Sequence, residues 1–179
     1  RVGPFGYGYI LNTGKVSAGY GAGNTIPVFD SATLLPVDVD NDRTTTTPGE
    51  AEGTSAITLP GILPTALAFS PDGGRLLVCQ RDTIKDDSGI RGKVILIDTD
   101  PASPKFNQIL KVSEAGLRPE GVGFWPDGRF AFVSCRWEHL IRVFDPNLRI
   151  ITTIPVNYPG QMVSVKRPKN KKATKSPVN

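Results

Sequence analysis

The sequence is poor in the residue types that build metal and nucleophilic sites. Its 179 residues include one histidine, two cysteines and one methionine. A single histidine excludes a histidine-rich metal centre within one chain. No G-x-S-x-G motif is present to place a serine nucleophile on a tight turn. A hydrolase would therefore need another positioned base and electrophilic group.

Long apolar runs and persistent helical periodicity are absent too. No run approaches the roughly 20 apolar residues that a membrane-spanning helix needs. The chain begins with Arg1 rather than methionine and has no signal peptide. We therefore expect a processed mature chain or part of a longer one, secreted to an extracellular or periplasmic location.

An excess of basic residues exists only at the carboxyl-terminal end. The formal net charge is +4, but residues 166–179 hold six of the 21 basic residues and no acidic one. The rest of the chain carries 15 basic against 17 acidic residues. A slightly acidic body makes nucleic-acid binding an unfavoured function. Residues 166–179 are expected to form a disordered basic tail that could contact an acidic partner.

Glycine and proline are abundant, with 19 and 16 residues, which is typical of an all-β chain with many turns. The clearest pattern lies in residues 117–156. It predicts strands at 121–125, 130–135, 140–144 and 150–156, with Pro126-Asp127-Gly128 as the first turn. Phe132 and Val133 lie in a run that is apolar at successive positions. Both are therefore expected to be core residues on opposite faces of one strand.

The same pattern occurs upstream, so the chain contains an internal repeat. Pro64 and Pro119 are 55 residues apart, as are the two Pro-Asp-Gly turns at Pro71 and Pro126. Residues 93–98 match residues 140–145 at a spacing of 47, which places an eight-residue insertion within 82–92 of the first copy. Repeats of roughly 40–50 residues with four strands each indicate a β-propeller.

The remaining segments are assigned around these two copies, 57–113 and 117–156. Residues 1–40 are interpreted as a blade without its first strand, with strands at 7–12, 25–30 and 34–39. Residues 40–56 are polar and low in complexity, and we expect an insertion between blades. The stretch 161–165 is expected to supply the missing strand, so that residues 1–165 form about three four-stranded antiparallel blades.

The motif P-x-G/A-x-x-F-x-P-D-G, followed by an apolar strand, V/I-x-V/I-F/I-D and T-I-P-V, resembles the YVTN-type and lactonase-like β-propeller repeats. The resemblance covers residues 64–165 well and 5–40 weakly. It implies the fold. It leaves the function open, because such propellers include carbohydrate lactonases, cofactor-bearing oxidoreductase domains, surface-layer proteins and binding scaffolds.

Two arginines and the histidine are the candidate catalytic residues under a hydrolase interpretation. Arg81 and Arg136 occupy the same repeat position, at the end of a strand. Residues 132–139 resemble the "YVSNRGH" segment of lactonase-like propellers, in which arginine and histidine line a polar cleft, although His139 follows Arg136 by three residues instead of two. The alternative is that both arginines pair with carboxylates or backbone carbonyls at blade edges. Glu120 is interpreted as a solvated turn residue.

Three further expectations concern metal and sulfur. Asp38, Asp40 and Asp42 alternate in a way that could bind calcium, but the glycine and glutamate of an EF-hand are missing, so a solvated acidic loop and no cofactor are favoured. Cys79 and Cys135 lie one register apart on equivalent strands and should face opposite sides of their blades. No disulfide between them is expected.

The sequence thus favours a non-enzymatic binding or structural-interaction protein, or a subunit of a larger assembly. A lactonase-like hydrolase acting on sugar lactones and a propeller subunit of a cofactor-bearing oxidoreductase are the alternatives. Propellers typically have about 4–8 blades, so three would leave two apolar faces open. We therefore expect the chain to associate with itself or with another chain that completes the ring.

Overall fold

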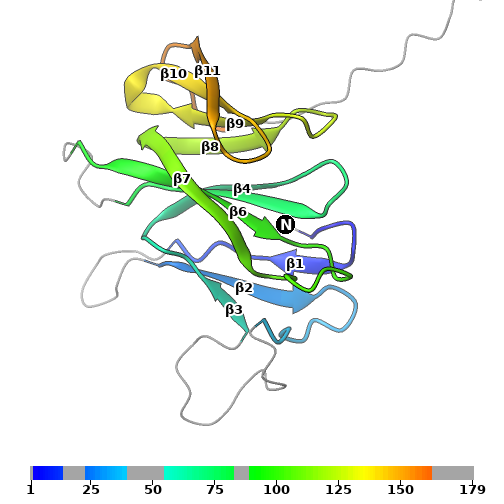
Figure 1. Cartoon of the computed structure of the whole chain (residues 1–179). Helices are drawn as coiled ribbons and strands as arrows, with labels where there is room; N and C mark the ends of the chain where they lie inside the picture. Colours follow the sequence, from blue (N-terminus) through cyan, green and yellow to red (C-terminus); the bar gives the residue numbers. More distant parts are fainter. Residues whose placement is uncertain (1, 14–22, 40–54, 83–88, 163–179) are drawn as a thin grey trace, which may run out of the picture.

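The computed structural model describes residues 2–13, 23–39, 55–82 and 89–162. These residues form three antiparallel sheets that stack face to face as successive blades of a β-propeller-like fold (Figure 1). The fold is all-β, as predicted. The described residues contain no helix of the length and apolarity that crossing a bilayer requires.

The third blade follows the sequence prediction closely. Its strand order is β8-β9-β10-β11, so each strand pairs with the next along the chain. The strands are β8 (Pro119–Phe124), β9 (Ala131–Cys135), β10 (Leu140–Phe144) and β11 (Ile150–Pro155). The repeat and its turns therefore predicted these strands to within two residues.

The second blade has the same order, but its limits differ from those predicted. Its strands are β4 (Pro64–Phe69), β5 (Arg75–Gln80), β6 (Arg91–Asp98) and β7 (Ile109–Leu117). The predicted repeat of 57–113 is therefore wrong at both ends. Residue 57 belongs to the preceding sheet, and the outermost strand continues past 113 to Leu117. Two register shifts let β7 follow β6, one opposite Ile109 and Lys111 and one opposite Glu114 and Gly116.

The first blade lacks an innermost strand in the described residues, as predicted, but its last strand differs from the prediction. Its strands are β1 (Tyr7–Tyr9), β2 (Thr25–Asp30) and β3 (Ala56–Thr58). Of the predicted strand at 34–39, only Pro36 forms a bridge, to Phe29 of β2. Ala56 pairs with Pro27, two positions before Phe29 in β2. The outermost strand of this blade is thus made of two segments, one around Pro36 and one at β3, which both pair with β2. The insertion interrupts this strand rather than separating two blades.

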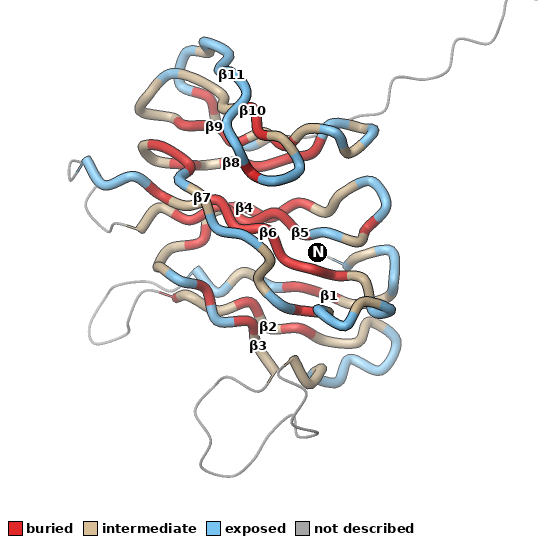
Figure 2. The backbone as a smooth tube through the Cα atoms, viewed as in Figure 1, coloured by how far each residue is buried: buried red, intermediate tan, exposed pale blue. Residues whose placement is uncertain are grey.

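Each interface between blades has its own hydrophobic core. Blade 1 meets blade 2 through Tyr9, Ile26 and Val28 on one side and Leu76, Val78 and Ile95 on the other. Blade 2 meets blade 3 through a second cluster. Its fully buried members include Leu77, Val94, Val133 and Phe144. Figure 2 shows that buried backbone concentrates in the central sheet, whereas β11 is exposed.

The two Pro-Asp-Gly turns are held by the same contact. The Asp72 carboxylate accepts a hydrogen bond from the Gly74 N–H (3.1 Å), and the Asp127 carboxylate accepts one from the Arg129 N–H (3.0 Å). Gly73 and Gly128 have φ values of 79° and 77°, a region that glycine enters without steric cost. The hydrogen bond from the Ser70 hydroxyl at Asp72 and that from the Arg129 N–H at Asp127 lower the pKa of each carboxyl.

The outer face of blade 3 is only partly covered. We call Trp125, Phe132, Ile141, Val143 and Ile154 the open face, because strand pairing and the Trp125–Phe132 ring contact place them on one side of the sheet. Val133 is fully buried on the other side, as predicted. Phe132 is only half-buried among the described residues, whereas the sequence predicted it to lie in a closed core. No further blade covers it within the described part of the chain.

Cys79 and Cys135 are buried and unlinked, which confirms the expectation of no disulfide. Both lie in the core between blades 2 and 3. As predicted, they face opposite sides of their blades. Cys79 faces blade 3 and Cys135 faces blade 2, so both lie in the same interface. Burial raises the pKa of each thiol to about 12.

We expect neither cysteine to react with an aromatic disulfide reagent at pH 8 while the protein is folded. The reactive form is the thiolate, and burial both suppresses it and blocks access. Absorbance of the released thiolate should show no modification under native conditions and two modified thiols in denaturant. Cys79→Ser should reduce the second value to one. Rapid labelling of the folded wild-type chain would contradict the buried assignment.

Candidate functional site

Polar residues gather where β5 and β9 end and β4 and β8 begin. Arg81 and Arg136 directly follow β5 and β9. Their backbone N–H groups donate equivalent hydrogen bonds of 3.1 Å, to the carbonyls of Leu63 and Arg118. Each acceptor residue precedes the proline that begins an inner strand and has positive φ. The repeat therefore places the two arginines equivalently in adjacent blades.

Glu120 of β8 joins two of these arginines. Its Oε1 accepts hydrogen bonds from Arg118 Nε at 2.7 Å and from Arg81 NH2 at 3.4 Å. The Arg118 guanidinium also lies 5.3 Å from the centre of the Trp137 ring. All three charged side chains are largely buried. The interpretation of Glu120 as a solvated turn residue was therefore wrong, because Arg81 of the neighbouring blade reaches it across the interface.

Arg136 differs from Arg81 in its side-chain contacts. Its guanidinium forms no hydrogen bond or ion pair with the residues that the structure describes, although the residue is half-buried. Arg81 thus has the carboxylate partner expected for a blade-edge pair, whereas Arg136 is fixed through its backbone. A guanidinium without a carboxylate partner is a donor that suits an anionic group.

His139 is held on the outer side of the blade. It ends the short 3-10 turn η1 (Arg136–Glu138) with a φ of 54°. Its Nδ1 lies 2.9 Å from the Asn157 side-chain oxygen, and its ring packs edge-on against Tyr158 at 4.2 Å. Among the described residues, none of its contacts is with Arg81 or Arg136. The three candidate catalytic residues therefore do not form one hydrogen-bonded group.

A further charged pair of this region was not predicted from the sequence. Glu138 accepts two hydrogen bonds of 2.9 Å from Arg142 NH2 and forms a 2.8 Å ion pair with Arg91 of blade 2. Partial burial opposes the charged form of Arg142, yet the hydrogen bonds and charge of Glu138 raise its pKa above the ordinary value. The four-residue spacing was a signal, but it is usually interpreted as a helical pair.

Gly116 makes room for this pair. A Cβ atom there would lie 2.3 Å from Glu138 Oε2 and 2.7 Å from Cys135 Sγ, and the residue has a φ of 120°. Any side chain at this position would displace the carboxylate.

A second carboxylate, that of Asp82, binds groups at one end of blade 2. Asp82 Oδ1 accepts hydrogen bonds from the Ile62 N–H at 3.0 Å and from Gln80 Nε2 at 3.2 Å. Its other oxygen pairs with Lys93. This carboxylate is therefore engaged in fixing the strand ends.

The described residues contain no group of three histidine, cysteine, aspartate or glutamate side chains that could hold a metal ion. Asp38 lies in the described part, and Asp40 and Asp42 lie outside it. Neither the favoured solvated loop nor the calcium alternative is therefore tested.

The comparisons with known proteins support the fold. No protein-family model matches the sequence. Over 87 residues the chain is 34% identical to Antigen Lp49 of Leptospira interrogans serogroup Icterohaemorrhagiae serovar copenhageni, a match that covers 45% of this chain and 18% of that protein.

Two solved structures are similar over most of this chain. A candidate 6-phosphogluconolactonase from Bacteroides fragilis superposes with a TM-score of 0.56 at 17% identity, covering 87% of this chain and 38% of the other. The dihydro-heme d1 dehydrogenase NirN superposes with a TM-score of 0.53 at 16% identity, covering 87% and 25%. The chain therefore spans well under half the length of each protein it matches. At such identities the likeness establishes a β-propeller-like fold and not an activity.

Proposed function

We propose that the chain is a non-enzymatic binding and assembly module, a partial β-propeller whose open face associates with further blades. The observation that carries the proposal is the difference in burial between equivalent positions of blades 2 and 3. Leu77 and Val94 are fully buried under blade 3. Phe132 and Ile141, their repeat equivalents, are only half-buried.

The open face has the chemistry of a blade interface. Ile154 and Trp125 are 43% and 48% exposed, and both adjoin the half-buried side chains. Contiguous apolar surface of this kind is typical of a protein–protein contact. Gly160 and Gln161 already lie against Gly121 of the innermost strand β8, where the next blade of a propeller would begin. The favoured partner is a second copy of the chain, with a different chain as the alternative.

We expect the purified chain to have the solution mass of a dimer at micromolar concentration, and Ile154→Glu to make it monomeric. A glutamate on the open face would have to be desolvated against apolar side chains on association. Light scattering coupled to size-exclusion chromatography measures the mass directly.

Thr153→Glu is the matched control, because Thr153 is the exposed neighbour on the same strand and pairs opposite Arg142, on the other face. It should leave the mass unchanged. A folded wild-type monomer would overturn the self-association proposal.

A lactonase-like hydrolase or an oxidoreductase subunit is the second candidate. It is favoured by the likeness to a candidate lactonase and by the unpaired guanidinium of Arg136. In a hydrolase, Arg136→Ala should remove activity towards a panel of sugar lactones while the circular dichroism spectrum is unchanged. Arg118→Ala should instead lower stability, because it breaks a pair with Glu120. Wild-type protein that is inactive on the whole panel would count against this candidate.

Contact of the basic tail with an acidic partner and an extracellular or periplasmic location complete the proposal, with no cofactor favoured and calcium at Asp38, Asp40 and Asp42 as the alternative. They rest on the sequence alone. Calorimetric titration with calcium would test the calcium alternative.

A further inference from the structure

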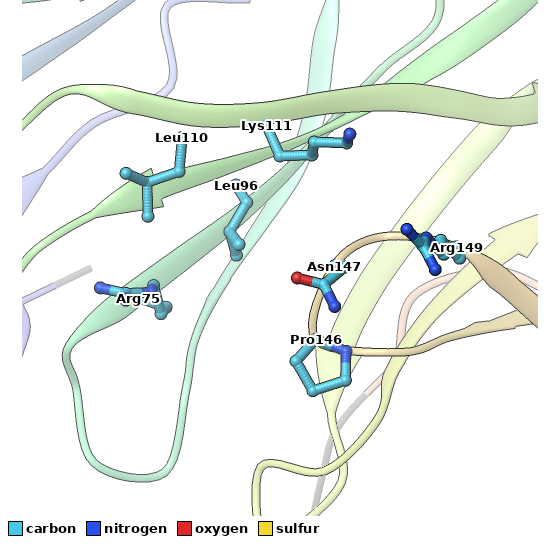
Figure 3. A pocket seen from close by; sticks show the side chains of 7 residues that line it. All are labelled: Arg75, Leu96, Leu110, Lys111, Pro146, Asn147 and Arg149. Carbon is cyan, nitrogen blue, oxygen red and sulfur yellow. The ribbon is translucent and has the colours of Figure 1, made fainter.

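A recess with a cationic lining lies between the outer strands of blades 2 and 3. Its volume is about 360 Å³. The lining residues are Arg75, Leu96, Leu110, Lys111, Pro146, Asn147 and Arg149 (Figure 3). Three of the seven are basic and none is acidic, whereas the blades as a whole are slightly acidic.

The basic groups in this recess differ in their contacts. Arg75 pairs with Asp98 at 3.2 Å and lies on the side of the recess away from Asn147 and Arg149. Lys111 and Arg149 form no hydrogen bond or ion pair through their side chains with any residue that the structure describes. Figure 3 shows the Lys111 amine extending towards the side on which Asn147 and Arg149 lie. Two unpaired cations and a side-chain amide thus share one side of the recess.

The turn that carries Asn147 and Arg149 is fixed in place. The Asp145 carboxylate accepts hydrogen bonds from the N–H groups of both residues, at 2.8 and 2.9 Å. Leu148 between them is buried, with a φ of 54°. Its carbonyl accepts a 2.9 Å hydrogen bond from the Ser113 hydroxyl of β7, the strand that carries Lys111. The two cations therefore belong to different blades but are held in register by this link.

The carboxylates that adjoin the recess are engaged elsewhere. Asp98 is bound to Arg75 and to the Ser103 hydroxyl. Asp145 is occupied by backbone N–H groups. Neither carboxylate neutralises Lys111 or Arg149. A second recess, of about 500 Å³, shares Arg75, Leu96 and Pro146 and is also lined by Asp72 and Asp127 of the two Pro-Asp-Gly turns. The site therefore has room, beside the anion, for an uncharged or cationic part of a larger molecule.

From this geometry we propose that the recess is a binding site for a small molecule that carries a phosphate or carboxylate group. Lys111 and Arg149 would donate charge-assisted hydrogen bonds to the anion, and Asn147 would orient it. The site lies wholly between two blades of one chain. It is therefore independent of how the propeller is completed and goes beyond the assembly function proposed above.

Titration of the full-length chain with inorganic phosphate, at constant ionic strength set by chloride, tests the site. Nuclear magnetic resonance of the backbone amides of Lys111, Asn147 and Arg149 should show saturable shifts, with a Kd on the order of 1 mM for two exposed cationic donors. Malonate, a dicarboxylate, forms the second arm, and both titrations are made at pH 8, where both anions are mainly dianions. Tighter binding of phosphate assigns a phosphorylated ligand, and tighter binding of malonate assigns a carboxylate ligand.

Lys111→Gln and Arg149→Gln should each weaken binding about fivefold. Lys105→Gln is the matched control, because Lys105 is an exposed lysine outside the recess and the net charge changes equally. It should leave the Kd unchanged. The proposal is overturned if neither anion gives saturable shifts, or if the control weakens binding as much as Lys111→Gln.

Discussion

Replacing Phe144 by alanine should lower the free energy of unfolding by about 3–5 kcal/mol, the range for truncation of a buried aromatic side chain. Phe144 is fully buried in the core between blades 2 and 3. It pairs with Ala131 of β9, which is too small to fill the space that the ring would leave. Urea unfolding, followed by the fluorescence of Trp125 and Trp137, measures the change.

Phe132→Ala is the control for this prediction, because it truncates the same type of side chain in the same blade. The two phenylalanines lie on opposite faces of the same blade, and Phe132 is only half-buried. Its truncation should destabilise the dissociated chain much less than Phe144→Ala, and should weaken association instead. Equal losses at a concentration where the chain is monomeric would show that another segment covers the open face. A loss below about 1 kcal/mol for Phe144→Ala would contradict the assigned core.

The fold could be predicted from the sequence where local signals and the repeat agree. The Pro-Asp-Gly turns set the ends of two strands in each complete copy, and the runs of apolar residues imply sheets covered on both faces. The same signals do not apply to the fourth strand of the first blade. There, Pro36 and Ala56 both pair with β2, at Phe29 and Pro27, although the insertion separates them in sequence.

Burial and charge pairing across blades were harder to predict. A pattern that is apolar on both faces does not say whether the neighbouring blade is present, so Phe132 was assigned to a closed core. Glu120 and Glu138 each bind an arginine from the adjacent blade, Arg81 and Arg91. Such contacts depend on how blades stack, which sequence spacing within one repeat does not contain.

The second large effect is expected at the pair between Glu138 and Arg142. Their side chains are 11% and 12% exposed. Glu138→Ala would leave the Arg142 guanidinium largely buried with its bidentate partner removed. Loss of one member of a buried pair typically costs 3–5 kcal/mol, and the residual exposure reduces this to about 2–4 kcal/mol of unfolding free energy. Urea unfolding at pH 7 measures it.

Glu114→Ala is the control for this variant, because Glu114 pairs with Arg91 at the surface, where the side chains are 55% and 43% exposed. Its removal should change stability by about 0–1 kcal/mol. The double variant Glu138→Leu/Arg142→Met removes both charges and keeps similar volumes, so it should recover most of the stability lost in Glu138→Ala. If Glu138→Ala is no more destabilising than Glu114→Ala, the pair is solvated and does not hold the ends of blades 2 and 3 together. If the double variant is as unstable as the single one, packing rather than the stranded arginine causes the loss.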